Sequence, residues 1–209
     1  MTLYVPPLFA QNESAAVARL IHDYPFATLV TPAAAEPWLS HIPLLLIGGG
    51  AHGTLIGHFA RANAHWQHAR EVESIAVFQG PHAYVSPSWY RDPAQAVPTW
   101  NFTAVHAHGR LELIDDARDT LDVLGALIER FESKRAAPWT LAMPERQRDA
   151  LVGAIVAFRM PIARIDAKFK LSQNRPGDDR IRVIAALKAE GYSEASATAA
   201  WMQAYAAAD

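Results

Sequence analysis

Histidines are the first residues of this chain whose type and spacing suggest chemistry. Eight of the nine histidines lie between His41 and His108, and none follows His108. His106 and His108 stand two apart in a segment with strand-like alternation, so they share a face. His65 and His68 stand three apart in a predicted helix. Such spacings can hold a divalent metal or a heme, although few carboxylates are nearby. The competing interpretation, and the commoner one, is a set of ordinary hydrogen-bonding histidines.

The stretch GHFARANAHW, which begins at residue 57, has the composition of an anion site. We expect a strand to end at about residue 58 and a helix to begin at about Ala62. Arg61 and Asn63 then lie at the junction, where free N–H groups and the helix dipole favour a negative charge. The planar fork of arginine suits a phosphate, which carries close to two charges at neutral pH. The competing interpretation is an ordinary strand-to-helix turn with an exposed arginine.

A second polar stretch, KFKLSQNRP, begins at Lys168 and surrounds one leucine with lysine, serine, amide and arginine side chains. Strand alternation places Lys168, Lys170 and Ser172 on one side of an extended segment. The stretch is either a solvated strand end before Pro176 or a second polar arm for a ligand that carries a phosphate and amide-like edges.

Aromatic rings and prolines are concentrated in GPHAYVSPSWY, residues 80–90, and in PTWNF, residues 98–102. Exposed rings on a surface connection are costly. We therefore expect them to cover a barrel mouth or a subunit interface, or to stack on a flat ligand. These interpretations agree with one another if the ligand lies at the interface.

Composition excludes several classes of function. The chain contains no cysteine, so thiolate catalysis and disulfides are excluded, and no Gly-x-Ser-x-Gly elbow marks a serine hydrolase. The net charge of −2 is unlike that of a broad nucleic-acid-binding surface. No apolar run reaches about 18 residues, and no secretory signal precedes the first helix, so we expect no membrane span and a cytoplasmic location.

The C-terminal residues predict two short helices separated at Gly191, an arrangement that resembles a DNA-reading helix pair. The second helix, SEASATAAWMQAYA, contains no lysine or arginine. A recognition helix needs basic or amide groups to reach phosphates and base edges. Direct DNA binding by this pair is therefore not supported, and we expect Trp201 and Met202 to pack against a neighbour.

The remaining pattern predicts an α+β fold. A helix after Asn12 is followed by strand-like segments with hairpin connections and by a long alternating strand from residue 99 to 115. Helical periodicity follows from 115 to 135 and from 144 to 156, and then strand character returns before the helical tail. Strands joined by hairpins form antiparallel sheets, and such sheets tend to close into barrels.

Five motifs occur in an order that resembles the PaiB-type family, the FMN-binding negative transcriptional regulators. They are YVPPLF, GHFARANAHW, VFQGPHAYVSPSWY, VPTWNFTAVHAHG and KFKLSQNRP, and the similarity runs from about residue 1 to about residue 187. The family looks like a branch of the antiparallel split β-barrels related to pyridoxamine-phosphate oxidase, which are homodimers with FMN between protomers. The resemblance implies a split barrel with flanking helices: an FMN-binding domain over 1–176 with inserted helices, and a C-terminal helical tail over 177–209 that extends the same domain.

The resemblance also implies a set of cofactor-binding residues. The phosphate would lie near His58, Arg61 and Asn63, and the flavin ring near His41 to Leu44. The partner protomer would contribute a second group near its neighbour's cofactor: Ser88, Trp89, Thr99, Trp100, Asn101, Lys170, Gln173 and Arg175.

Three functions follow from these observations. The first is a flavin-dependent regulator in which FMN acts as a redox or occupancy signal. The second is a flavin reductase or a small oxidoreductase similar to pyridoxamine-phosphate oxidase, with no general acid or base assigned. The third is a heme- or metal-binding protein built on the histidine cluster.

Overall fold

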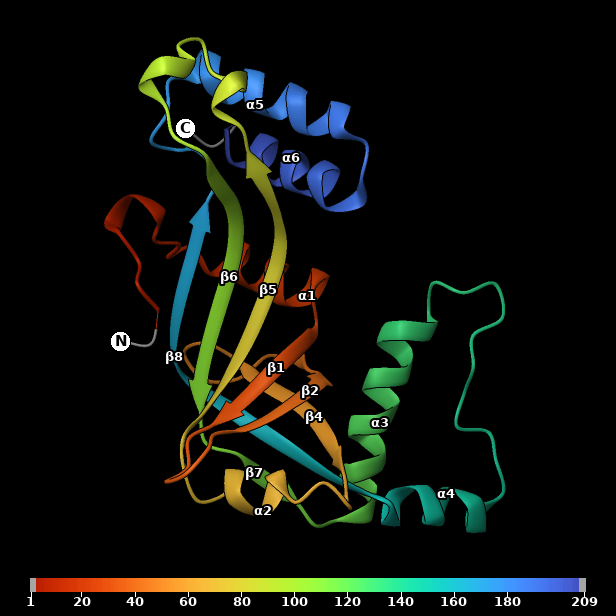
Figure 1. The fold of residues 1–209 in the computed structure, drawn as a ribbon. Coiled ribbons are helices and arrows are strands. Elements are labelled where there is room, and N and C mark those ends of the chain that lie inside the picture. Colours follow the sequence, from red (N-terminus) through yellow and green to blue (C-terminus); the bar gives the residue numbers. More distant parts are fainter. Residues whose placement is uncertain (1–2, 207–209) are drawn as a thin grey trace. The chain divides into compact units, whose positions relative to one another are not determined.

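The computed structural model describes residues 3–206 and combines helices with one eight-stranded antiparallel sheet (Figure 1). The α+β class predicted from the sequence is therefore confirmed. The strands are β1 (Phe26–Thr31), β2 (Trp38–Pro43), β3 (Leu45–Ile47), β4 (Thr54–Ala60), β5 (Ser74–Val85), β6 (Thr99–Gly109), β7 (Glu112–Ile114) and β8 (Ile155–Lys170). Their hydrogen-bonded order is β2-β1-β5-β6-β8-β4-β3, with β7 paired to β8.

The helices are α1 (Ser14–Asp23), α2 (His65–Ala69), α3 (Ala117–Glu132), α4 (Glu145–Gly153), α5 (Gly177–Glu190) and α6 (Ser193–Ala206). Single 3₁₀ turns occur at Pro7–Phe9, Pro87–Trp89 and Pro93–Gln95. The structure describes no helix that is both long and apolar enough to cross a membrane.

The chain divides into two compact units, which are described separately. Unit 1 contains the described parts of residues 1–23, 79–105 and 166–209, and unit 2 contains Tyr24–Phe78 and His106–Ile165. Strands β5, β6 and β8 supply residues to both units. The expectation that residues 177–209 are a helical extension of the same domain as residues 1–176 stays a prediction.

Unit 2 contains two hairpins. β1 pairs with β2, with Thr28 opposite His41, and β3 pairs with β4, with Leu46 opposite Leu55. The strand-like run 38–47 is thus divided between two hairpins at Leu44, which is fully buried and donates its N–H to Pro25 O. Pro43 supplies no N–H for a ladder, which favours a strand end at this position.

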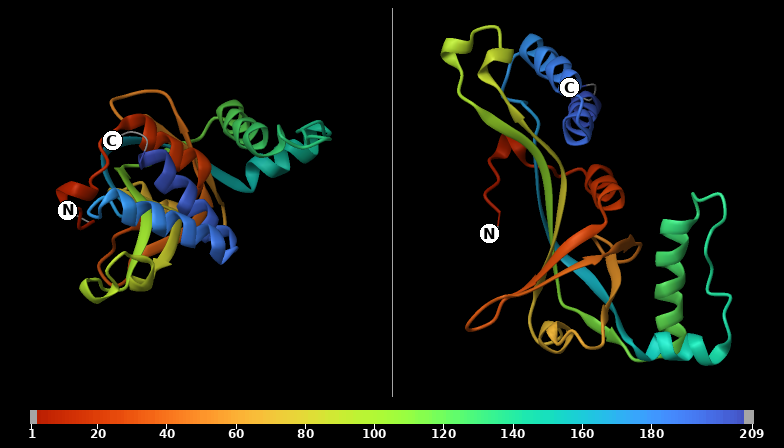
Figure 2. Two further views of the ribbon diagram at one scale, coloured as in Figure 1. Left: turned by 90° about the horizontal axis from the view of Figure 1, so that it is seen from above. Right: turned by 45° about the vertical axis from the view of Figure 1, so that its right-hand side comes forward.

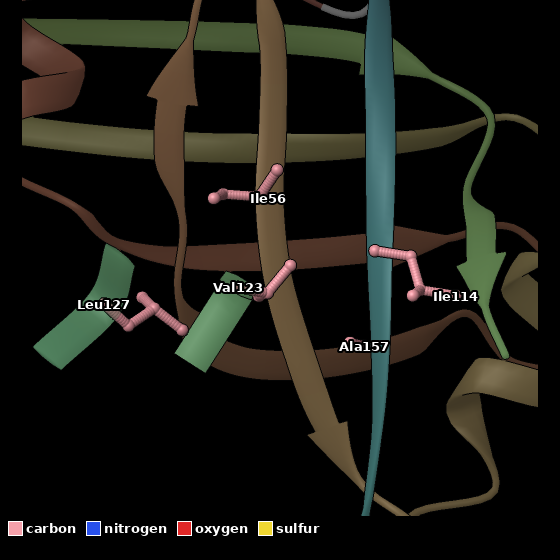
Figure 3. Close-up of a cluster of buried hydrophobic side chains, with 5 residues drawn as sticks. All are labelled: Ile56, Ile114, Val123, Leu127 and Ala157. Atoms are coloured by element: carbon pink, nitrogen blue, oxygen red, sulfur yellow. The ribbon is translucent and has the colours of Figure 1, made fainter. Parts of the chain in front are cut away.

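One hydrophobic cluster of unit 2 lies between α3 and strands β4, β7 and β8. Asp116 caps α3 by accepting hydrogen bonds from the N–H groups of Arg118 and Asp119. One turn apart on the buried face of α3, Val123 and Leu127 pack with side chains from three strands. Figure 3 shows this cluster, which consists of Ile56, Ile114, Val123, Leu127 and Ala157.

Unit 1 is organised around its C-terminal helices. α5 ends at Glu190 and is capped by Gly191, whose φ of 74° is the left-handed conformation that glycine adopts easily. α6 then packs beside α5 (Figures 1 and 2). Trp201 and Met202 are buried within the same chain, and the Trp201 ring meets Phe169 edge-on at 5.5 Å. The two helices therefore serve a packing role in unit 1.

Two further local expectations differ from the structure. The long strand predicted over 99–115 is divided, because β6 ends at Gly109 and β7 begins at Glu112. Ser172 does not continue the face of Lys168 and Lys170, because it follows β8 in a turn with a φ of 66° and is buried.

Gly109 provides a test of the bend after β6. A methyl group at this position would collide with Pro161 O and lie 2.9 Å from Met160 Cγ. We expect Gly109→Ala to lower the free energy of unfolding by roughly 1–3 kcal/mol through overpacking. Urea denaturation followed by circular dichroism would measure this change in the free energy of unfolding.

Gly125 in α3 is the matched control, because an added methyl group there has nothing within 4 Å. Gly125→Ala should leave stability unchanged or raise it by up to about 1 kcal/mol. Equal stability of Gly109→Ala and the wild type would contradict the close packing described at the bend.

Candidate functional site

The turn after β4 holds Arg61 in a fixed position. The Arg61 N–H donates to Ala154 O at 2.8 Å, and its side-chain Nε and Nη2 donate to Gly153 O and Ile155 O, both at 2.6 Å. Arg61 O accepts a hydrogen bond from Trp66 Nε1 at 3.1 Å. The side chain is nevertheless exposed, and in the described part of the chain no hydrogen bond engages Nη1. Arg61 therefore presents one free edge of a fixed cation to solvent.

Beside Arg61 lies a buried polar network centred on His65. The ring is fully buried, and each of its nitrogens takes part in a hydrogen bond. Nδ1 lies 2.8 Å from Ser40 Oγ, and Nε2 lies 2.7 Å from Thr31 Oγ1. Thr31 Oγ1 in turn lies 2.7 Å from Ser74 Oγ. The network joins α2 to β1, β2 and β5. Burial lowers the pKa of His65 to about 4 and is the main cause of the shift. The charge of the nearby His68 is the second cause.

Asn63 belongs to this network rather than to solvent. Its Nδ2 donates to Ser40 Oγ at 3.0 Å, and its Oδ1 accepts the N–H of His65 at 3.1 Å. The amide thus shapes the turn in which Arg61 stands. His41 lies on β2, is exposed, and contacts Thr28 Oγ1 through Nδ1 at 3.0 Å.

His58 lines a pocket of about 300 Å³ between β4 and α3. Its Nδ1 is buried and has no hydrogen-bond partner, and burial lowers the pKa of the ring. The other lining residues are Pro43, Leu124, Leu127, Ile128, Phe131, Glu132 and Trp139.

Unit 1 brings together a second group of the residues predicted from the sequence. Lys170 Nζ donates to Thr99 Oγ1 and to Trp100 O, both at 2.6 Å. Burial, followed by the charges of Lys168 and Arg175, lowers the pKa of Lys170. The exposed Trp100 ring lies 6.2 Å from the His82 ring. A cation and an open aromatic surface are therefore adjacent.

The remaining predicted residues of unit 1 have local partners. Asn101 is fully buried and donates to Ser172 Oγ at 2.9 Å and to Met202 Sδ at 3.3 Å. Gln173 accepts the N–H of Leu171 at 2.6 Å. The Arg175 guanidinium lies 4.4 Å from the centre of the Tyr90 ring. Ser88 Oγ contacts Ser86 Oγ at 2.8 Å, and Trp89 is half-buried in the same 3₁₀ turn.

The predicted cofactor-binding residues thus form two groups. His41, His58, Arg61 and Asn63 lie in unit 2, and all the others lie in unit 1. The role of each toward a cofactor stays a prediction. Within residues 3–206, no group of three or more histidine, aspartate or glutamate side chains has an arrangement that could hold a metal ion. Sequence patterns did not identify Phe131 and Trp139, because only the packing of α3 on β4 brings them to His58.

Comparison with known proteins assigns the family. A family model described as "Putative FMN-binding domain" matches residues 3–164. The Bacillus subtilis "Protease synthase and sporulation protein PAI 2" is 34% identical over 205 residues, which cover 96% of this chain and 97% of that protein. The chain belongs to the PaiB-type family of FMN-binding domains.

Solved structures confirm the fold that this PaiB-type resemblance implied. The FAD and heme binding protein from Mycobacterium smegmatis has a TM-score of 0.62 at 16% identity, over 88% of this chain and 80% of that chain. The flavocytochrome Anf3 from Azotobacter vinelandii has a TM-score of 0.59 at 17% identity, over 81% of this chain and 70% of that chain. The PaiB-type chain is therefore a split barrel, as predicted.

His65 makes the stability of this PaiB-type protein depend on pH. Its pKa of about 4 in the folded chain lies below the ordinary value of 6.5, so the unfolded chain binds the proton more readily. The stabilisation is complete above pH 6.5 and is lost as the pH falls toward 4. We expect this residue to contribute up to about 3 kcal/mol to the loss of unfolding free energy over that range.

Chemical denaturation at pH 7 and pH 4.5 would measure the effect. His65→Gln should show a smaller loss of stability on acidification than the wild type. His52→Gln changes an exposed histidine in the turn before β4 and should leave the wild-type loss unchanged. The same pH dependence in His65→Gln and the wild type would show that another group is responsible.

Proposed function

We propose that this protein is an FMN-binding homodimer that acts as a flavin-dependent regulator, with the cofactor held between two copies of the chain. The observation that carries the proposal is the Arg61 edge, fixed by two backbone carbonyl groups and open to solvent, in a chain of the FMN-binding-domain family. A planar guanidinium is well suited to a phosphate.

The donor set of the chain fits the phosphate of FMN. Unit 2 supplies the free Nη1 of Arg61, and unit 1 supplies cations at Lys168, Lys170 and Arg175. Lys170 uses two of its three N–H groups on Thr99 and Trp100, so one remains for a ligand. When bound, FMN would supply a redox-active ring, and the protein would hold and orient it.

Two copies of the chain are proposed because the recognition groups are divided between the two units. Arg61 of one copy would bind the phosphate, and the Lys170 group of the other copy would approach the same cofactor. Exposed rings of Tyr84 and Trp100, 6.1 Å apart, give unit 1 an aromatic surface for that contact. Aromatic side chains are enriched at protein interfaces.

A regulatory role is supported by the Bacillus subtilis relative, whose name refers to protease synthase and sporulation. The absence of lysine and arginine from α6 argues against direct base reading by this helix. We propose that FMN occupancy, or the redox state of FMN, is the signal.

Arg61→Ala should weaken FMN binding several-fold to a hundredfold, because a charge-assisted hydrogen bond contributes about 1.5–3 kcal/mol. Quenching of flavin fluorescence during titration would measure the dissociation constant. Arg146→Ala removes another exposed arginine of unit 2 and should leave the affinity unchanged. Wild-type affinity in Arg61→Ala would show that the phosphate binds elsewhere.

The shared site predicts complementation between two defective chains. Arg61→Ala and Lys170→Ala homodimers should each bind FMN weakly. A mixed dimer of the two variants has one site with both changes and one site with neither, so it should recover about one strong site per dimer. Purified mixed dimers with two different tags would provide the stoichiometry.

Failure to recover any strong site in the mixed dimer would contradict the shared arrangement. A monomer seen by light scattering at the concentration of the titration would also contradict it. FMN binding by such a monomer would leave the cofactor assignment intact and remove only the dimer.

A further inference from the structure

We propose that α4 controls the affinity of the Arg61 edge for a phosphate, because the guanidinium is held in its binding orientation only while α4 is helical. This regulation rests on the proposed function, since it concerns the phosphate that Arg61 would bind. Arg61 and α4 both belong to unit 2, so the contacts that join them lie within one compact unit.

Arg61 bonds three consecutive carbonyl groups at the end of α4. Its Nε donates to Gly153 O and its Nη2 to Ile155 O, both at 2.6 Å. Its backbone N–H donates to Ala154 O at 2.8 Å. Gly153 is the last residue of α4, and Ala154 is its C-cap. The last carbonyl groups of a helix have no partner within the helix, so an arginine donor at this end stabilises the helix.

Apart from its contact with α3, α4 is weakly stabilised. The helix has nine residues, and none of them is buried. Within the described chain, no side-chain hydrogen bond caps its N-terminus at Pro144, and residues 133–144 join it to α3 without a helix or strand (Figure 1). Helices of this length are marginal in water, and segments with few buried contacts unfold locally. We therefore expect α4 to open more readily than α3, which buries Val123 and Leu127.

The state of α4 decides what Arg61 presents to a ligand. While α4 is folded, Nε and Nη2 are bound to carbonyl groups, and the open edge of the guanidinium has one orientation. When α4 unfolds, these carbonyl groups move away and the side chain samples many rotamers, which a bound phosphate would have to restrict. A phosphate therefore binds more tightly while α4 is folded. By linkage, the bound phosphate also stabilises α4.

Hydrogen exchange in the absence of any ligand tests the link between Arg61 and α4. In Arg61→Ala, the amides of α4 should exchange roughly tenfold faster than in the wild type, because the side-chain hydrogen bonds to the end of the helix are lost. The amides of α3 should keep their wild-type rates. Arg146→Ala removes an exposed arginine of α4 itself and should not speed the exchange. Equal exchange of α4 in Arg61→Ala and the wild type would overturn the proposal.

Fluorescence titration with FMN and with riboflavin, which lacks the phosphate, tests the control of affinity. Ala150 is an exposed residue of α4. Ala150→Gly should lower the preference for FMN over riboflavin by up to about fivefold, and Ala150→Pro should lower it further, because each weakens the helix. The affinity for riboflavin should keep its wild-type value.

Ala185→Gly is the matched control, because it makes the same change at an exposed position of α5 and should leave the preference for FMN unchanged. An unchanged preference in both Ala150 variants would overturn the control by α4. An equal loss of affinity for FMN and riboflavin in these variants would also overturn it, because α4 would then act on the whole protein and not on the phosphate.

Exchange in the presence of flavin separates this inference from the proposed function. Saturating FMN should slow the exchange of α4 amides in the wild type several-fold, and riboflavin should not. FMN binding without any change in α4 exchange would leave the proposed function intact and overturn the regulation by α4. A wild-type protein that binds neither flavin would remove the proposed function, whereas faster α4 exchange in Arg61→Ala would still support the link between Arg61 and α4.

Discussion

The pairing of β4 with β8 is the constraint on which the structure of unit 2 depends. Its register runs from Thr54 opposite Pro161 to Ala60 opposite Ile155, and the Arg61 hydrogen bonds to residues 153–155 extend the connection past the end of the strand. α3 rests on the same strand pair through the cluster in Figure 3. Arg159 of β8 also contacts Asp119 of α3, with Nη2 3.2 Å from Oδ2. A shift of one residue in this register would turn Ile56 away from α3 and move Arg61 away from its carbonyl partners.

The polar residues next to this strand pair differ in how many of their hydrogen-bonding groups are already used within the protein. Hydrogen bonds join His65, Asn63 and Ser40 to one another, so these residues specify the turn. Arg61 donates two side-chain hydrogen bonds to backbone carbonyl groups and keeps one edge of its guanidinium open. The buried Nδ1 of His58 has no hydrogen-bond partner. The open edge of Arg61 is exposed, so a ligand there can gain a hydrogen bond that folding did not use.

Local sequence patterns determined much of the fold. The capped apolar stripe of α3, the left-handed stop at Gly191 and the β3–β4 hairpin follow from contacts within a few residues, and the five motifs specified the split-barrel family. Tertiary structure alone decided that the run 38–47 is divided at Leu44, that His65 is buried between hydroxyl groups of β1 and β2, and that Asn101 bonds Ser172 and Met202. It also placed Phe131 and Trp139 next to His58. These features depend on partners that are distant along the chain, and periodicity shows which face of an element is apolar without showing what that face will meet.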